Sequence, residues 1–192
     1  MSSRRGFLSI DTISSSIRGA GFLREVDVSA RQDEIVAAID AAHAELMELV
    51  ASATPAQWRM AGVNHPEIQF GEDEHRPVGV IAHHVATAYA ATIDRCRAWT
   101  RGELPPPPTA ETNARHESAN PDPNHAETIR LLGDNANGLK DFARGLSDKD
   151  LDAKGLFARG ETSVGKMLGE TTPYHIRWHA GSIRATWAQS AG

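Results

Sequence analysis

The sequence is poor in cysteine and has no long apolar run. Cys96 is the single cysteine among 192 residues, so no internal disulfide can form and the chain does not require an oxidising compartment. On a helix Cys96 falls about 20° from Val85, which predicts a buried core thiol rather than a nucleophile. No segment is apolar over the roughly 20 residues that a membrane-spanning helix needs. These absences favour a soluble, cytoplasmic protein.

Positive charge is also scarce. Twenty lysines and arginines stand against 25 aspartates and glutamates, which gives a net charge of −5. The basic residues form no local cluster that would offset this balance. Such a chain has no general attraction for phosphate backbones, so nucleic acid is not expected as a partner.

Several catalytic motifs are missing as well. The sequence contains neither the G-x-S-x-G of a nucleophile elbow nor the H-E-x-x-H of a zinc protease. GETSVGKM, residues 160–167, approaches the phosphate-binding pattern G-x-x-x-x-G-K-[ST]. However, Met167 stands where a hydroxyl would hold magnesium, and no buried strand is predicted before this segment. A capped helix start explains it better than a nucleotide site.

The N-terminal SSRRGFL resembles part of a twin-arginine export signal. The matching residues are Arg4, Arg5, Phe7 and Leu8. The continuation IDTISSSIRGAG then places Asp11 and Arg18 where such a signal needs an apolar region. We therefore expect residues 1–28 to form a short N-terminal arm and residues 29–192 to form the single domain.

Apolar residues recur at helical spacing in four segments, and alternation of the strand type is almost absent. The spacing predicts helices over about residues 30–53, 77–101, 123–146 and 162–189. Each helix has an apolar stripe that the others must cover, which predicts an all-α four-helix bundle. The connections at about 54–76 and 102–121 are long enough to cross the bundle, because the four prolines of GELPPPPTAE stop the second helix early.

Local signals indicate where these helices begin. The predicted caps or first residues are Ser29 with Gln32, Pro77, Asp122 with Pro123, and Thr162 or Ser163. Pro173 interrupts the last segment, because it cannot donate a backbone hydrogen bond to Gly169. Either a new helix starts there with Thr172 as its cap, or the long helix kinks one turn before His175.

Three histidines fall on the inward faces of the second and fourth helices. In HIRWHAGSIR, residues 175–184, His175 and His179 lie about 40° apart on one face. His84 lies on the inner side of the second helix, whereas His83 points to the opposite side. Two histidines from one helix and a third from a facing helix can present three nitrogen donors to one metal ion, with positions left for water or substrate.

Bland interpretations of the histidines also apply. An H-x-x-x-H pair often arises by chance, and an inward histidine can be a packing residue. His43 lies on the apolar side of the first helix and is interpreted as a structural or solvent-contacting residue. Solvation explains the histidines of predicted loops and of one helix start, which are His65, His75, His116 and His125. The acidic GEDEHR, residues 71–76, is interpreted as a solvated turn, with a border of the site as the alternative.

Helix-forming PVGVIAHHVATAYA, followed far downstream by H-x-x-x-H-x-G-x-I as HIRWHAGSI, resembles the DinB/YfiT-like superfamily. Trp58 and the segment SDKDLDAKGLF support the resemblance, which covers most of residues 30–190. It implies a four-helix bundle with long crossovers in which His84, His175 and His179 bind a divalent metal. Ser182, Trp178 and Pro173 depart from the common pattern, which puts the substrate in doubt more than the metal.

The resemblance also implies thiol-dependent transferases or isomerases that act on small molecules with a low-molecular-weight thiol. We therefore expect a metal-dependent enzyme, with thiol S-transfer favoured over hydrolysis and with no general base assigned by the sequence. Zinc or nickel is the expected ion and iron is an alternative, since imidazole suits all three. A non-catalytic metal-binding stress protein and a metal-free helical interaction module are the other hypotheses. A homodimer is expected by the resemblance alone.

Overall fold

The computed structural model describes residues 30–67, 74–158 and 160–190, which form a bundle of four long helices. The long helices are α1 (Ala30–Val50), α3 (Val78–Thr100), α5 (His125–Arg144) and α8 (Thr172–Ser190). The short elements are α2 (Pro55–Trp58), α4 (Ala110–Ala119), α6 (Asp148–Asp152), β1 (Lys154–Phe157), β2 (Gly160–Ser163), α7 (Val164–Lys166) and the π-helical turn η1 (Met167–Thr171). The predicted all-α four-helix bundle is confirmed. The predicted arm, residues 1–28, and the cap Ser29 lie outside the described residues.

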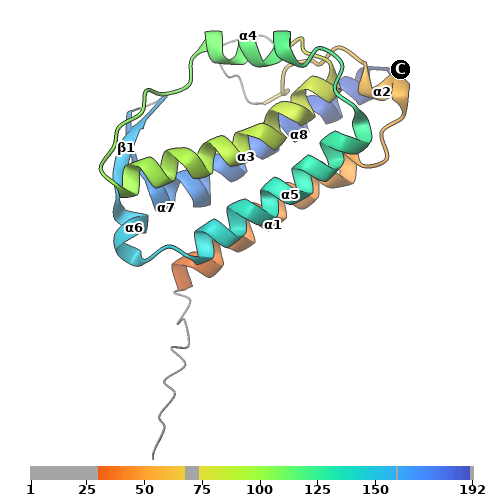
Figure 1. The fold of residues 1–192 in the computed structure, drawn as a ribbon. Helices are drawn as coiled ribbons and strands as arrows, with labels where there is room; N and C mark the ends of the chain where they lie inside the picture. Colours follow the sequence, from red (N-terminus) through yellow and green to blue (C-terminus); the bar gives the residue numbers. More distant parts are fainter. Residues whose placement is uncertain (1–29, 68–73, 159, 191–192) are drawn as a thin grey trace, which may run out of the picture.

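The order of the helices around the bundle differs from their order in the chain. Helices α1 and α3 each pack against both α5 and α8, so α1 and α3 lie on a diagonal. Figure 1 shows α1 and α8 running in one direction and α3 and α5 in the other. The chain from α3 to α5 must therefore return along the length of the bundle, and it carries α4 on the way. The expected long crossover is confirmed.

The core lies between the four long helices. Each contributes fully buried apolar side chains, among them Ile39, Leu46, Ile81, Leu132, Leu139 and Ile183. Burial of one such side chain stabilises the fold by about 1.5–3 kcal/mol, so the apolar stripes account for the assembly. Cys96 is buried in this core, as its helical phase predicts. Within the described ranges, no helix is both long enough and apolar enough to cross a membrane.

Helix α5 begins later than the sequence predicts. Its cap is Asn124, whose side chain accepts a hydrogen bond from the Glu127 N–H at 3.1 Å, so the prediction of Asp122 and Pro123 as cap and first residue is wrong by two positions. The indole of Trp58 donates to the Pro123 carbonyl at 2.8 Å. This long-range bond holds Pro123 in the connection before the helix.

Both long connections contain structure that periodicity does not reveal. Helix α4 starts with a capping box at Thr109, yet none of its residues is buried, so it has no apolar stripe to predict. Strands β1 and β2 pair antiparallel, with Lys154 opposite Ser163. Each strand has only four residues, too few to give a clear alternating pattern.

The segment before α8 solves the problem that Pro173 creates. Ser163 caps α7 by accepting from the Lys166 N–H at 3.2 Å, so one of the two predicted starts is confirmed and residues 160–163 form a strand rather than a phosphate loop. The chain then widens into η1, where the backbone N–H and the hydroxyl of Thr172 both bond to the Met167 carbonyl. Thr172 is helical, so its predicted role as a cap is wrong. A π-helical turn absorbs the missing donor of Pro173 and delivers His175 into a continuous helix.

Candidate metal centre

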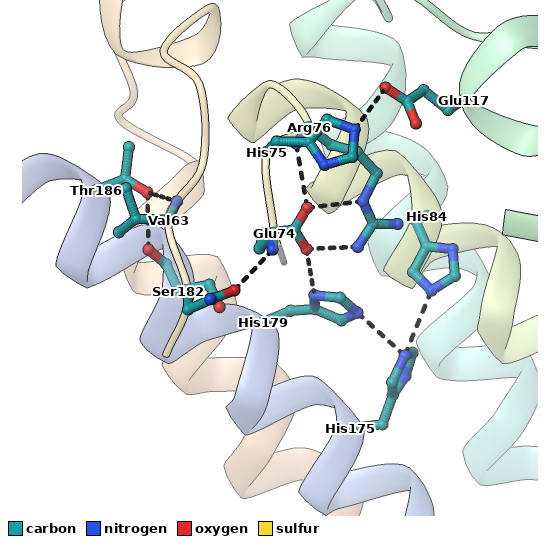
Figure 2. A network of polar contacts seen from close by, with 11 residues as sticks. Val63, Glu74, His75, Arg76, His84, Glu117, His175, His179, Ser182 and Thr186 are labelled. Atoms are coloured by element: carbon teal, nitrogen blue, oxygen red, sulfur yellow. Dashed lines mark hydrogen bonds and ion pairs between the residues drawn. The ribbon is translucent and has the colours of Figure 1, made fainter. Parts of the chain in front are cut away.

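The structure brings His84 of α3 together with His175 and His179 of α8 (Figure 2). The Nε2 atom of His175 lies 3.3 Å from Nε2 of His84 and 3.1 Å from Nε2 of His179. One ring nitrogen from each residue lies within 4.8 Å of the other two. The helical phases in the sequence thus correctly place these three side chains on facing helix surfaces.

The three rings differ in exposure and share a low-dielectric setting. His179 is fully buried, whereas His84 and His175 are partly exposed. The indole of Trp178 covers one side, with its ring centroid 4.4 Å from that of His179. The cluster is therefore closed on its inner side and accessible from its outer side.

Burial keeps these histidines neutral. Loss of solvation lowers the pKa of His175 to about 4, helped by the positive charge of Arg76. Burial is also the main cause that holds the pKa values of His84 and His179 well below their usual range, with repulsion by His175 next. Near neutral pH each ring therefore offers a lone pair, which is the form that binds metals.

A buried ion pair stands behind His179. Glu74 and Arg76 form a fork, with Arg76 Nε 2.8 Å from Oε1 and Arg76 Nη2 2.5 Å from Oε2. Their side chains are only 2% and 11% exposed. Glu74 Oε2 also lies 3.7 Å from Nδ1 of His179, on the side of the ring away from the cluster (Figure 2). A carboxylate there favours the proton on Nδ1 and leaves the Nε2 lone pair facing the other rings.

The loop that carries this ion pair is held by backbone bonds. Gly62 donates to the Arg76 carbonyl at 2.9 Å, and Val78 donates to the Met60 carbonyl at 3.0 Å. The backbone N–H of Glu74 donates to Asn64 Oδ1 at 2.6 Å. A Cβ at position 62 would come within 2.8 Å of the Arg76 carbonyl, so only glycine allows this approach. The first connection therefore positions the Glu74 carboxylate as firmly as a helix would.

The interpretation of residues 71–76 as a solvated turn is wrong for Glu74 and Arg76, which are buried beside the histidines. The alternative that this segment borders the site is correct for those two residues. Residues 71–73 lie outside the described residues. Charged residues in a loop have no helical phase, so the sequence offered only their nearness to the start of α3 as a signal.

The other histidines have structural partners. His83 packs against His116 of α4, with His83 Nδ1 3.0 Å from His116 Nε2, so the prediction of His116 as a solvated loop residue is wrong. His43 pairs with the hydroxyl of Tyr89 at 3.1 Å, as a structural residue should. His125 bonds to the Val50 carbonyl at 2.8 Å rather than to water alone.

His65 also departs from the solvated interpretation, because it packs on α8. A Cβ at Gly181 would overlap the His65 ring, so this glycine lets the loop approach the helix two residues beyond His179. His75 is the histidine that fits the prediction, with its side chain 76% exposed and 3.8 Å from Glu117 Oε1.

The chemistry of the donor set fits a divalent cation. Hydrogen bonds alone serve this cluster poorly, because His175 Nε2 faces two other ring nitrogens and has either one proton or one lone pair to offer. Two nitrogens bound to one tetrahedral zinc ion at 2.0–2.1 Å lie about 3.3 Å apart, which is close to the observed separations. The orientation of His179 by Glu74 matches the carboxylate–histidine pairs of zinc sites.

No protein-family model and no curated protein matches the sequence. Solved structures do match. YfiT from Bacillus subtilis, described as a probable metal-dependent hydrolase with an unusual four-helix bundle topology, gives a TM-score of 0.65 at 15% identity over 83% of this chain and 87% of its own. The mycothiol-dependent maleylpyruvate isomerase gives 0.62 at 16% identity over 79% of this chain, which spans only 60% of that protein; a point mutant of the same isomerase matches equally. The chain therefore has the four-helix bundle topology of YfiT, and the resemblance seen in the sequence is confirmed for the fold.

Proposed function

We propose that this protein is a metal-dependent enzyme whose divalent ion is held by His84, His175 and His179. The observation that carries the proposal is the convergence of three neutral imidazole nitrogens, two pairs of them at 3.1 and 3.3 Å, backed by a buried carboxylate. Zinc or nickel is the proposed ion and iron the alternative, because imidazole accepts each of them.

A cation bound by three uncharged ligands keeps its full charge and lowers the pKa of a thiol or water that occupies the open side. The chain's own residues prepare this situation. Burial keeps the rings unprotonated, and Glu74 fixes the tautomer of His179. Partial exposure of His84 and His175 leaves the outer side of the cluster accessible to a small molecule.

Thiol chemistry suits this site better than hydrolysis. Among the described residues, Glu74 is the one carboxylate that contacts the three histidines, and the guanidinium of Arg76 engages both its oxygens. Glu74 is therefore poorly suited to act as a general base. A free thiol with a pKa near 8.5 needs far less activation than water near 15.7, so it manages without a base. We infer a thiol-dependent S-transferase or isomerase that uses a low-molecular-weight thiol.

The fold of a mycothiol-dependent isomerase is similar, which agrees with this inference. Hydrolysis is the second candidate, because the similar YfiT structure is described as a probable metal-dependent hydrolase. A non-catalytic metal-binding protein is the remaining alternative.

Metal analysis tests the centre itself. Protein purified without a nickel column should contain close to one divalent metal per chain, measured by elemental analysis, and an absorption-edge scan should identify it. Replacement of both His175 and His179 by alanine should remove the metal and the increase in melting temperature that metal gives the wild-type protein. A wild-type protein that neither retains metal nor is stabilised by zinc, nickel or iron would favour the helical interaction module.

Turnover tests the chemistry. The metal-loaded protein should accelerate conjugation of a small thiol with an electrophile, and the variant without His175 and His179 should give only the background rate. Accelerated hydrolysis of an ester or amide without thiol transfer would establish the second candidate. A metal-loaded protein that accelerates neither reaction would indicate a binding protein.

A further inference from the structure

Two buried nitrogens near the histidine cluster lack hydrogen-bond partners among the described residues. They are Nη1 of Arg76 and Nδ1 of His116. An unpaired buried donor costs about 1–3 kcal/mol, so such atoms are rare unless a ligand or water completes them. Arg76 as a whole is only 9% exposed, which makes its free nitrogen the more informative of the two.

The geometry of Arg76 leaves one edge of the guanidinium available. Glu74 occupies the edge formed by Nε and Nη2, so Nη1 lies on the opposite edge. Figure 2 shows this nitrogen on the side of the guanidinium that faces His84. The Arg76 charge also lowers the pKa values of His84 and His175, which places it within electrostatic reach of both. The free nitrogen thus borders the candidate metal centre.

His116 provides a second donor beside the same ring. Its ring centroid lies 5.4 Å from that of His84, and Nε2 is engaged by His83 Nδ1 at 3.0 Å. If His83 donates in that contact, the neutral His116 ring carries its own proton on Nδ1. The nearest acid on α4, Glu117, is paired with His75. His84 is therefore flanked by two donors that have no acceptor among the described residues.

The balance of charge indicates which group these donors bind. The Glu74–Arg76 pair has no net charge, and three neutral histidines leave the two positive charges of a divalent ion uncompensated. A thiolate would offset one of them and one carboxylate would offset the other. Arginine N–H groups recognise carboxylates well, and such charge-assisted bonds are stronger than neutral ones.

We propose that Arg76 Nη1, together with His116 Nδ1, forms a carboxylate-binding subsite beside the candidate metal centre. The substrate class is then a small thiol that carries a carboxylate, with its sulfur at the three histidines and its carboxylate at Arg76. This inference rests on the proposed function for the sulfur but not for the carboxylate.

The test compares two thiols that differ only in charge. Zinc-loaded protein is titrated with 3-mercaptopropionate and with 3-mercapto-1-propanol by calorimetry at neutral pH. The wild-type protein should bind the carboxylate about tenfold or more tightly, because a charge-assisted hydrogen bond is worth about that factor. Arg76→Lys keeps a cation for Glu74 but removes Nη1, so it should abolish most of the preference and leave the affinity for the neutral thiol unchanged.

Two further variants make the outcome decisive. Arg59→Lys alters an exposed arginine paired with Asp122, away from the histidines, and should keep the full preference. His116→Phe should reduce the preference severalfold, and it serves if Arg76→Lys fails to fold by thermal unfolding. Equal affinity of the wild-type protein for the two thiols, or a preference retained in both Arg76→Lys and His116→Phe, would overturn the subsite.

Propionate separates this inference from the proposed function. If neither thiol binds through sulfur, seen as absent thiolate absorption in cobalt-loaded protein, but propionate binds and depends on Arg76, then the subsite stands and the thiol chemistry is wrong. If both thiols show sulfur absorption with equal affinity and propionate does not bind, then the thiol chemistry stands and the subsite is wrong.

Discussion

His83 and His84 are neighbours in the sequence, yet they belong to different parts of the molecule. His84 faces α8 and meets His175 and His179, while His83 faces α4 and meets His116. Both contacts bring ring nitrogens to 3.0–3.3 Å. In the α8 cluster a third nitrogen and a buried carboxylate complete the arrangement, whereas the α4 pair has two nitrogens.

The difference shows that distance between histidines alone does not make a metal site. A step of about 100° around α3 turns one ring to a helix that supplies two more donors at i and i+4. It turns the other ring to a helix with no buried residue. Number of donors, burial and support by a carboxylate therefore distinguish the two clusters, and each can be removed separately.

The largest difference should appear in metal retention. His84→Ala should weaken metal binding by more than about a hundredfold, because it removes one of three ligands from a site whose binding energy is on the order of 10 kcal/mol. His83→Ala should keep about one metal per chain. Elemental analysis after dialysis and competition with a chelator give both values. Equal losses in the two variants would contradict the assignment of His84.

Acid should destabilise the metal-free protein through the α8 cluster. The pKa of His175 is about 4 in the folded chain, against 6.5 for an ordinary histidine, so the unfolded chain takes up this proton first as the pH falls. Its contribution to stability is full above pH 6.5 and is lost between 6.5 and about 4, to the extent of roughly 3 kcal/mol.

Urea unfolding at several pH values measures this loss. His175→Gln should flatten the dependence on pH clearly. His83→Gln should do so less, because the His83 ring is only half-buried, although its pKa is lowered by burial in the same direction. The same slope in wild-type protein and His175→Gln would show that another group titrates.

The supporting carboxylates give a smaller contrast. Glu74→Gln should weaken metal binding about 10- to 100-fold, because an amide orients His179 less strongly than a carboxylate does. Glu117→Gln is the matched change at the α4 pair, where the partner His75 is exposed, and it should leave metal affinity unchanged. Metal affinities from chelator competition decide the comparison, and an unaltered value for Glu74→Gln would exclude its role in orienting the ligand.

The smallest effect should come from the α4 pair itself. His116→Ala should change the free energy of unfolding by about 1 kcal/mol or less, because α4 buries no residue and the lost contact is one neutral hydrogen bond. Its metal content should equal that of the wild-type protein. Urea unfolding and elemental analysis test both statements, and a lost metal would mean that α4 belongs to the metal centre.

Long elements and inward histidines were predictable because they follow one rule. Apolar side chains at helical spacing reveal α1, α3, α5 and α8, and the same phase count turns His84, His175 and His179 inward. Helix α4 and the β1–β2 hairpin escaped prediction, since neither presents a periodic apolar face to the core.

The sequence by itself determined four amphipathic helices and the faces on which three histidines lie, because helical periodicity is a local property of the chain. Tertiary structure alone decided that Glu74 and Arg76 stand buried behind His179 and that His116 approaches His84. It also decided that Thr172 continues a helix instead of capping one. These outcomes depend on loop paths fixed by contacts between distant segments, such as Gly62 with Arg76 and Gly181 with His65, and no local pattern encodes them.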